Sequence, residues 1–168
     1  MTLATVTKEP NIAGTRLPSR ERFEEYFAAE LERSKRFEYS LALIVITVPG
    51  IKAAQGGPVI RAMAEACAGS IRAYDYACHM RDNQFAIMLP QTYNPAAREV
   101  ARRIERQFHA SARQHGVMES PTLLIGVAAF PFDGDTVLGL FHAAEDDRVP
   151  SLPPDSRFDD EHKKALSA

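Results

Sequence analysis

The sequence lacks cysteine pairs, long hydrophobic runs and an excess of charge of one sign. Its two cysteines, Cys67 and Cys78, form no C-x-x-C pair, and each sits in an apolar stretch where a free thiol behaves as a small hydrophobe. The longest apolar run, Leu41 to Val48, is far shorter than the roughly 20 residues that span a bilayer. The net charge of -2 gives no reason to expect nucleic acid or a membrane surface as partner. We therefore expect a cytoplasmic protein without direct membrane insertion.

The familiar catalytic and metal-binding motifs are missing as well. The chain contains no P-loop, no nucleophile elbow and no zinc pattern. His109, His115 and His142 lack metal-ligand spacing. His79 is a lone histidine on a predicted strand, where packing or hydrogen bonding is the usual role. We expect neither a metal nor a cofactor.

What the sequence does contain is one ordinary globular domain. Its 168 residues, 45% hydrophobic and 25% charged, suffice to bury a core without disulfides. Residues 1–17 are polar and without sustained periodicity, which indicates a flexible leader. Residues 18–148 carry the periodic segments. Residues 149–168 begin with prolines and serines and end in charged residues, which predicts a disordered tail.

Hydrophobic periodicity predicts four helices and four strands. Ser19 is the expected N-cap of the first helix, and further helices are predicted from residue 58 to 71, from 94 to a stop at Gly116, and over 136–147. Strands are predicted over 40–48, 75–80, 84–89 and 122–130. This order, with strands alternating with helices and one direct hairpin, predicts an α/β sandwich with a central mixed sheet.

Several short segments, in a fixed order, resemble the GGDEF domain of diguanylate cyclases. The resemblance runs from about Thr15 to Asp147 and implies the nucleotidyl-cyclase-like (ferredoxin-like) α/β sandwich of that family, a central mixed sheet flanked by helices. The matching segments are Thr15 to Phe23 (family T-G-L-P-N-R-R-x-F), Leu41 to Lys52 (first strand and D-x-D-x-F-K), Arg81 to Thr92 (signature and following strand), Ala101 to Ile104 (A-E-R-I) and Ile125 to Ala128 (S-I-G-V-A).

The resemblance also implies that the catalytic carboxylates are lost. Family members join two GTP molecules with the help of divalent cations, which need charged oxygen ligands. The two aspartates of the family's first metal motif correspond to Thr47 and Pro49, and the acidic pair of its signature corresponds to Asn83 and Gln84. None of these replacements keeps the charge. We therefore expect no enzymatic activity.

The rest of the signature is degenerate too. Its glycines, which let a backbone approach a nucleotide closely, correspond to Arg81 and Asp82, and only Phe85 is kept. The guanine-binding loop is shortened around Gln55, although Lys52 survives, and the phosphate-binding lysine of the last helix is absent. The segment from Arg81 to Gln84 reads as a hairpin turn. It could bind a ligand or a partner, but Asp and Asn are ordinary turn residues, and we favour the turn.

The family's inhibitory site for cyclic di-GMP, in contrast, is kept. Arg72 and Asp75 match its Arg-x-x-Asp motif, nine residues upstream of the signature, and Arg103 matches the third residue of the site on the long helix. An arginine binds a guanine edge or a phosphate with two hydrogen bonds, and a carboxylate accepts from guanine N–H groups. Arg98, Arg102 and Arg106 lie further round the helix and are expected to form a solvated face with nearby glutamates.

The resemblance therefore implies a catalytically inactive receptor for cyclic di-GMP in bacterial second-messenger signalling. The bound dinucleotide would bridge this domain to a second copy or to another protein. The alternatives are an interaction module that binds no nucleotide, and a domain that binds GTP without turnover. In either case Arg72 and Asp75 would be a local ion pair, which contributes only about 0–1 kcal/mol when exposed.

Overall fold

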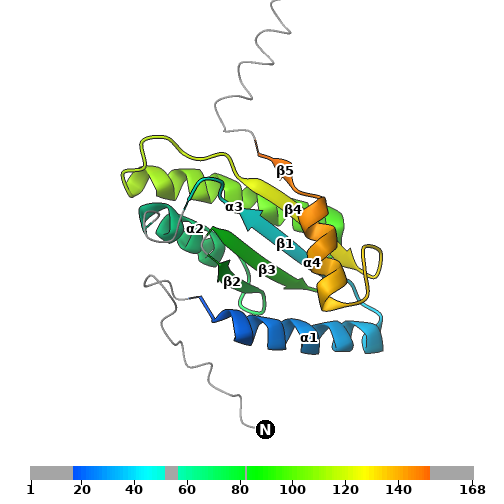
Figure 1. Ribbon diagram of the computed structural model, residues 1–168. Coiled ribbons are helices and arrows are strands. Elements are labelled where there is room, and N and C mark those ends of the chain that lie inside the picture. Colours follow the sequence, from blue (N-terminus) through cyan, green and yellow to red (C-terminus); the bar gives the residue numbers. More distant parts are fainter. Residues whose placement is uncertain (1–16, 52–56, 82, 152–168) are drawn as a thin grey trace, which may run out of the picture.

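The helices and strands follow the predicted order. The computed structural model describes residues 17–51, 57–81 and 83–151 (Figure 1). Along the chain the elements are α1 (Arg20–Phe37), β1 (Leu41–Thr47), α2 (Gly57–Ser70), β2 (Tyr76–Arg81), β3 (Gln84–Pro90), α3 (Asn94–Gln114), β4 (Leu124–Phe130), α4 (Val137–Asp146) and β5 (Val149–Pro150). The α/β prediction is thus confirmed, and the short strand β5 was not foreseen.

Local sequence signals set several helix ends. The Ser19 hydroxyl accepts a hydrogen bond from the backbone N–H of Arg22, so Ser19 is the N-cap of α1, as predicted. The hydroxyl of Thr136 caps α4 in the same way. Beyond the end of α3, Gly116 has a φ of 77°, a conformation that glycine adopts without strain and that stops the helix.

The described part of the sheet has the strand order β2-β3-β1-β4-β5, and every neighbouring pair is antiparallel. The first four strands have the ferredoxin-like order, but the expectation of a mixed sheet was wrong. Strands β1 and β2, which α2 connects, run in the same direction, and β3 inserts between them (Figure 1). No two parallel strands are therefore neighbours in the described residues.

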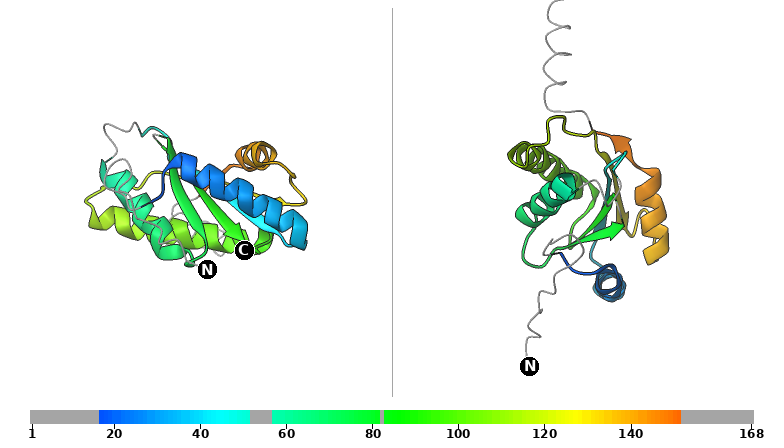
Figure 2. Two further views of the ribbon diagram at one scale, coloured as in Figure 1. Left: turned by 90° about the horizontal axis from the view of Figure 1, so that it is seen from below. Right: turned by 60° about the vertical axis from the view of Figure 1, so that its left-hand side comes forward.

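Helices cover both faces of the sheet, with α2 and α3 on one side and α1 and α4 on the other (Figure 2). Alternate residues of β1 enter two separate cores. Ala42, Ile44 and Ile46 pack toward α2 and α3, whereas Leu41 and Val45 pack toward α1 and α4. Because both faces are buried, the strand is a continuous apolar run rather than an alternating one.

Helix α4 lies unusually close to β4 at Gly126. A Cβ atom at this position would lie 1.8 Å from the backbone oxygen of Ala144. Only glycine permits this approach. The close packing gives a structural reason for the glycine in the Ile125 to Ala128 segment.

The disordered tail was predicted to begin at residue 149, but the chain is still ordered there. Strand β5 pairs with the start of β4, and the backbone N–H of Ser151 donates to the carbonyl of Leu123 at 2.7 Å. At the other end Leu17, assigned to the leader, is 6% exposed and belongs to the core. The remainder of the predicted leader and tail lies outside the described residues. Among those that are described, no helix is both long and apolar enough to cross a membrane.

Candidate functional site

The Arg-x-x-Asp segment forms a tight turn between α2 and β2. The backbone N–H of Arg72 donates to the Asp75 carboxylate at 2.8 Å, and the backbone N–H of Asp75 donates to the Arg72 carbonyl at 3.1 Å. An aspartate often closes a turn in this way. The spacing of the motif therefore has a local structural reason in addition to any role in binding.

Arg103 reaches the same corner from α3. Its Nε and Nη2 atoms both donate to the carbonyl of Ser70, at 3.0 and 2.5 Å. Ser70 is the last residue of α2, so this carbonyl is one of those that a helix cannot satisfy within itself. A cation at the carboxyl end of a helix is also favoured by the helix dipole. The contact fixes Arg103 beside the turn that holds Arg72.

The two guanidinium groups act on one carboxyl. Burial raises the pKa of Asp75 above its ordinary value, while the hydrogen bond from the Arg72 backbone and the charges of Arg72 and Arg103 oppose this shift. Asp75 is partly buried, whereas Arg72 and Arg103 are exposed. The three residues of the predicted binding site thus meet at one accessible corner.

Sequence reasoning missed one member of this corner, Tyr74. The Nη1 atom of Arg72 donates to the Tyr74 hydroxyl at 2.9 Å, and the guanidinium carbon lies 5.8 Å from the centre of the ring. The ring is 54% exposed. The available signal was an aromatic residue inside the Arg-x-x-Asp segment, where nothing in the fold requires one.

Arg81, Asn83 and Gln84 lie where β2 passes into β3, the junction predicted from the sequence, and their side chains are tied to neighbouring groups. The amide of Asn83 donates to the Val48 carbonyl at 3.1 Å, and the Arg81 guanidinium donates to the Gln84 side chain at 3.0 Å. Phe85 is fully buried and stacks on His79, with ring centres 4.6 Å apart, so the histidine packs as expected. Asp82 lies outside the described residues.

The side chains at positions that the resemblance pairs with the family's metal ligands have partners within the fold. Thr47, the counterpart of the first metal aspartate, accepts a hydrogen bond from Nη1 of Arg148 at 3.0 Å. Gln84, on the neighbouring strand, donates to the Glu145 carboxylate at 3.1 Å. That carboxylate also lies 3.7 Å from Nη2 of Arg81. Sequence reasoning gave no role to Arg148 or Glu145.

This set of groups does not fit a pair of divalent cations. Hard cations need several charged oxygens, whereas among the described residues Thr47 and Gln84 are neutral, and the Glu145 carboxylate accepts from Gln84 and lies beside the Arg81 guanidinium. The described ranges 17–51, 57–81 and 83–151 hold no cluster of three histidine, cysteine or carboxylate side chains that could bind a metal. Lys52 and Gln55 lie outside these ranges.

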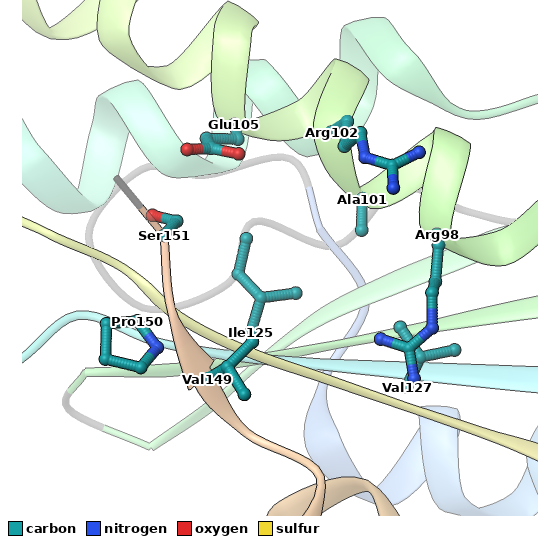
Figure 3. A pocket seen from close by; sticks show the side chains of 9 residues that line it. All are labelled: Arg98, Ala101, Arg102, Glu105, Ile125, Val127, Val149, Pro150 and Ser151. Carbon is teal, nitrogen blue, oxygen red and sulfur yellow. The ribbon is translucent and has the colours of Figure 1, made fainter. Parts of the chain in front are cut away.

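A hollow of about 340 Å³ lies between α3, β4 and β5 (Figure 3). Its arginines already have acidic partners. Arg98 donates to both carboxylate oxygens of Asp147 at 3.0 Å, and Arg102 pairs with Glu99. We expected Arg98 to lie on a solvated face. It instead links α3 to the end of α4. None of Arg72, Asp75 and Arg103 lines this hollow.

Comparison with known proteins identifies the domain type. A family model described as "Diguanylate cyclase, GGDEF domain" matches residues 13–148. No curated protein matches the chain.

Solved structures agree with this match. The GGDEF domain of YfiN (TpbB) from Pseudomonas aeruginosa is 26% identical, with a TM-score of 0.65 over 82% of this chain and 84% of that one. The diguanylate cyclase SiaD of the same organism, in complex with its activator SiaC, is 25% identical, with a TM-score of 0.65 over 79% of this chain and 54% of that one. The GGDEF domain of DgcB from Caulobacter crescentus, in complex with c-di-GMP, is 14% identical, with a TM-score of 0.70 over 86% and 90%.

Proposed function

This chain belongs to the GGDEF domain family of cyclic di-GMP signalling, and we propose that it is a catalytically inactive receptor for cyclic di-GMP. The observation that carries the proposal is the meeting of Arg72, Asp75 and Arg103 at one exposed corner. Arg72 and Arg103 come from different elements, 31 positions apart (103 − 72 = 31), yet both act on the Asp75 carboxyl.

The corner offers the hydrogen-bonding groups that a guanine nucleotide needs. Oδ2 of Asp75 accepts from the Arg72 backbone, and its other oxygen would accept from guanine N–H groups. Hydrogen bonds among the described residues use Nη1 of Arg72 and the Nε–Nη2 side of Arg103. The Nε–Nη2 side of Arg72 and Nη1 of Arg103 are then the donors for a guanine edge or a phosphate.

The proposal that the domain is inactive rests on the residues around Thr47 and Gln84. A cyclase needs carboxylates there to hold divalent cations beside the GTP phosphates. Thr47 instead accepts from Arg148, and Gln84 is tied to Glu145. The charged group beside Thr47 is thus the guanidinium of Arg148, and not a carboxylate that could bind a metal.

Isothermal titration with cyclic di-GMP tests the proposal. We expect the wild-type domain to bind more than one dinucleotide per site, because the family site accepts a stacked pair. Arg72→Ala should weaken binding by about 10- to 150-fold, which corresponds to the loss of a hydrogen bond with a charged group. Arg113→Ala, an exposed arginine ten positions further along α3 than Arg103 (113 − 103 = 10), is the matched control and should bind like the wild type.

Two results would overturn the proposal. The first is a well-folded wild-type domain that gives no binding heat with cyclic di-GMP. The second is formation of cyclic di-GMP from GTP and magnesium by the purified protein, because the groups around Thr47 and Gln84 would then support catalysis after all.

A second candidate function, an interaction module without a nucleotide, rests on a different surface. A hollow of about 310 Å³ between α1, β2 and α4 is lined in part by Met80, Val137, Leu138 and Phe141. Leu138 is 65% exposed, and an exposed apolar group of this kind suits a protein partner. The relative SiaD is found with a protein activator. If the module reading holds, partner binding should survive Arg72→Ala and be lost in Leu138→Asp.

A further inference from the structure

We propose that Tyr74 is a positioning residue of the nucleotide site, which orients Arg72 and provides a stacking surface for a guanine base. The inference rests on the proposed binding of cyclic di-GMP and assigns a specific role to a residue outside the Arg-x-x-Asp pattern. It starts from the contact between the Arg72 guanidinium and the Tyr74 hydroxyl.

The contact selects one side of the Arg72 guanidinium for the ligand. A guanidinium can offer two parallel N–H groups either from its end, Nη1 and Nη2, or from its side, Nε and Nη2. Tyr74 accepts from Nη1 and so occupies the end. The Nε and Nη2 atoms of Arg72 therefore remain for the ligand. The backbone N–H of the same residue holds the Asp75 carboxylate. A guanine that meets this side therefore meets a donor pair next to a carboxylate acceptor.

The ring of Tyr74 supplies the second part of the role. It lies in the turn before β2 and is 54% exposed, and the guanidinium carbon of Arg72 lies over it, 5.8 Å from its centre. Aromatic side chains stack on nucleic-acid bases with about 1–3 kcal/mol per base. Residues 74 and 75 are adjacent, so stacking and carboxylate recognition would act on the same base.

A structural role alone does not explain the contact. A hydrogen bond between exposed side chains contributes little to folding, because water replaces it at small cost. Removal of the Tyr74 hydroxyl should therefore leave the melting temperature unchanged. This separates an effect on the ligand from an effect on the fold.

Two substitutions separate orientation from stacking. Tyr74→Phe keeps the ring and loses the hydroxyl, and it should weaken cyclic di-GMP binding by about 3- to 10-fold, as expected for one net hydrogen bond. Tyr74→Ala loses both and should weaken binding by a further 5- to 150-fold, roughly, the range for one stacked base. Both variants should melt at the wild-type temperature, measured by circular dichroism.

A spectroscopic test uses the absence of tryptophan from the chain. Tyr74→Trp keeps an aromatic ring and introduces a single fluorophore, whose emission should be quenched when guanine stacks on it. Tyr93→Trp is the matched control. Tyr93 is 60% exposed and precedes Arg103 by ten positions, about 15 Å along α3, so its emission should not respond.

The inference and the proposed function can fail separately. If the wild type binds and Arg72→Ala abolishes binding, but Tyr74→Phe and Tyr74→Ala bind like the wild type, the role of Tyr74 is refuted and the receptor stands. Tighter binding by Tyr74→Phe would also refute it, since the hydroxyl would then compete with the ligand for Arg72. If the wild-type domain does not bind cyclic di-GMP, both the receptor function and the role of Tyr74 are refuted.

Discussion

Restoring the first metal aspartate should create an ion pair rather than a metal site. In the variant Thr47→Asp, the new carboxylate would stand where the Thr47 hydroxyl now accepts from Nη1 of Arg148 at 3.0 Å. The family's active site would regain a ligand in sequence. In space, however, the position already faces a cation.

The size of the effect follows from the distance. Two unit charges about 4 Å apart attract by about 4 kcal/mol at an effective dielectric constant of 20. Desolvation of the half-buried position and repulsion from Glu145, which is tied to the neighbouring Gln84, reduce this gain. We expect a net stabilisation of about 1 kcal/mol, which corresponds to about 2–4 °C in melting temperature for a chain of this length.

Thermal unfolding with and without millimolar magnesium measures the outcome. Thr47→Asp should melt above the wild type in both conditions by the same amount, and Thr47→Asn, similar in shape but neutral, should show no gain. If Thr47→Asp is no more stable than the wild type without magnesium but gains stability when magnesium is added, the new carboxylate binds metal. The conclusion that Arg148 occupies this place would then be refuted.

Two further predictions concern packing and pH. Gly126→Ala should destabilise the fold by about 3 kcal/mol or more in denaturant unfolding, because its Cβ would meet the Ala144 carbonyl. The control Gly69→Ala, with open space around it in α2, should be neutral or stabilise the fold by up to about 1 kcal/mol. Equal effects of the two substitutions would contradict the close packing at Gly126. Cyclic di-GMP affinity should fall on acidification from a higher pH than an ordinary aspartate would give, because burial raises the pKa of Asp75 and the ionised form accepts from guanine. The same pKa shift affects folding stability in the opposite direction. A carboxyl whose pKa is raised in the folded protein stabilises the folded state at pH values below its unfolded-state pKa, and this contribution is lost as the pH rises through its folded-state pKa. Titration calorimetry at several pH values, with Asp75→Asn as a control that should bind weakly and without this pH dependence, measures the effect on binding.

Periodicity and turn chemistry were enough to place most helices and strands. The stripe of α1, the Ser19 cap and the stop at Gly116 are local signals, because each depends on residues within a few positions. The short strand β5 could not be predicted in this way. Val149 and Pro150 carry no strand pattern of their own, and they pair only because α4 returns the chain to the edge of β4.

The candidate site divides in the same manner. The sequence by itself placed Arg72 at the end of a helix, Asp75 at the start of the next strand and Arg103 beside the buried stripe of α3, since these follow from residue type and spacing. The loss of the metal carboxylates is implied by the family resemblance and stays a prediction. Only the tertiary structure decided that Arg103 holds the end of α2 and that Arg148 faces Thr47, 101 positions away. Such contacts depend on how helices cross the sheet, and that is set by the packing of both cores together rather than by any one segment.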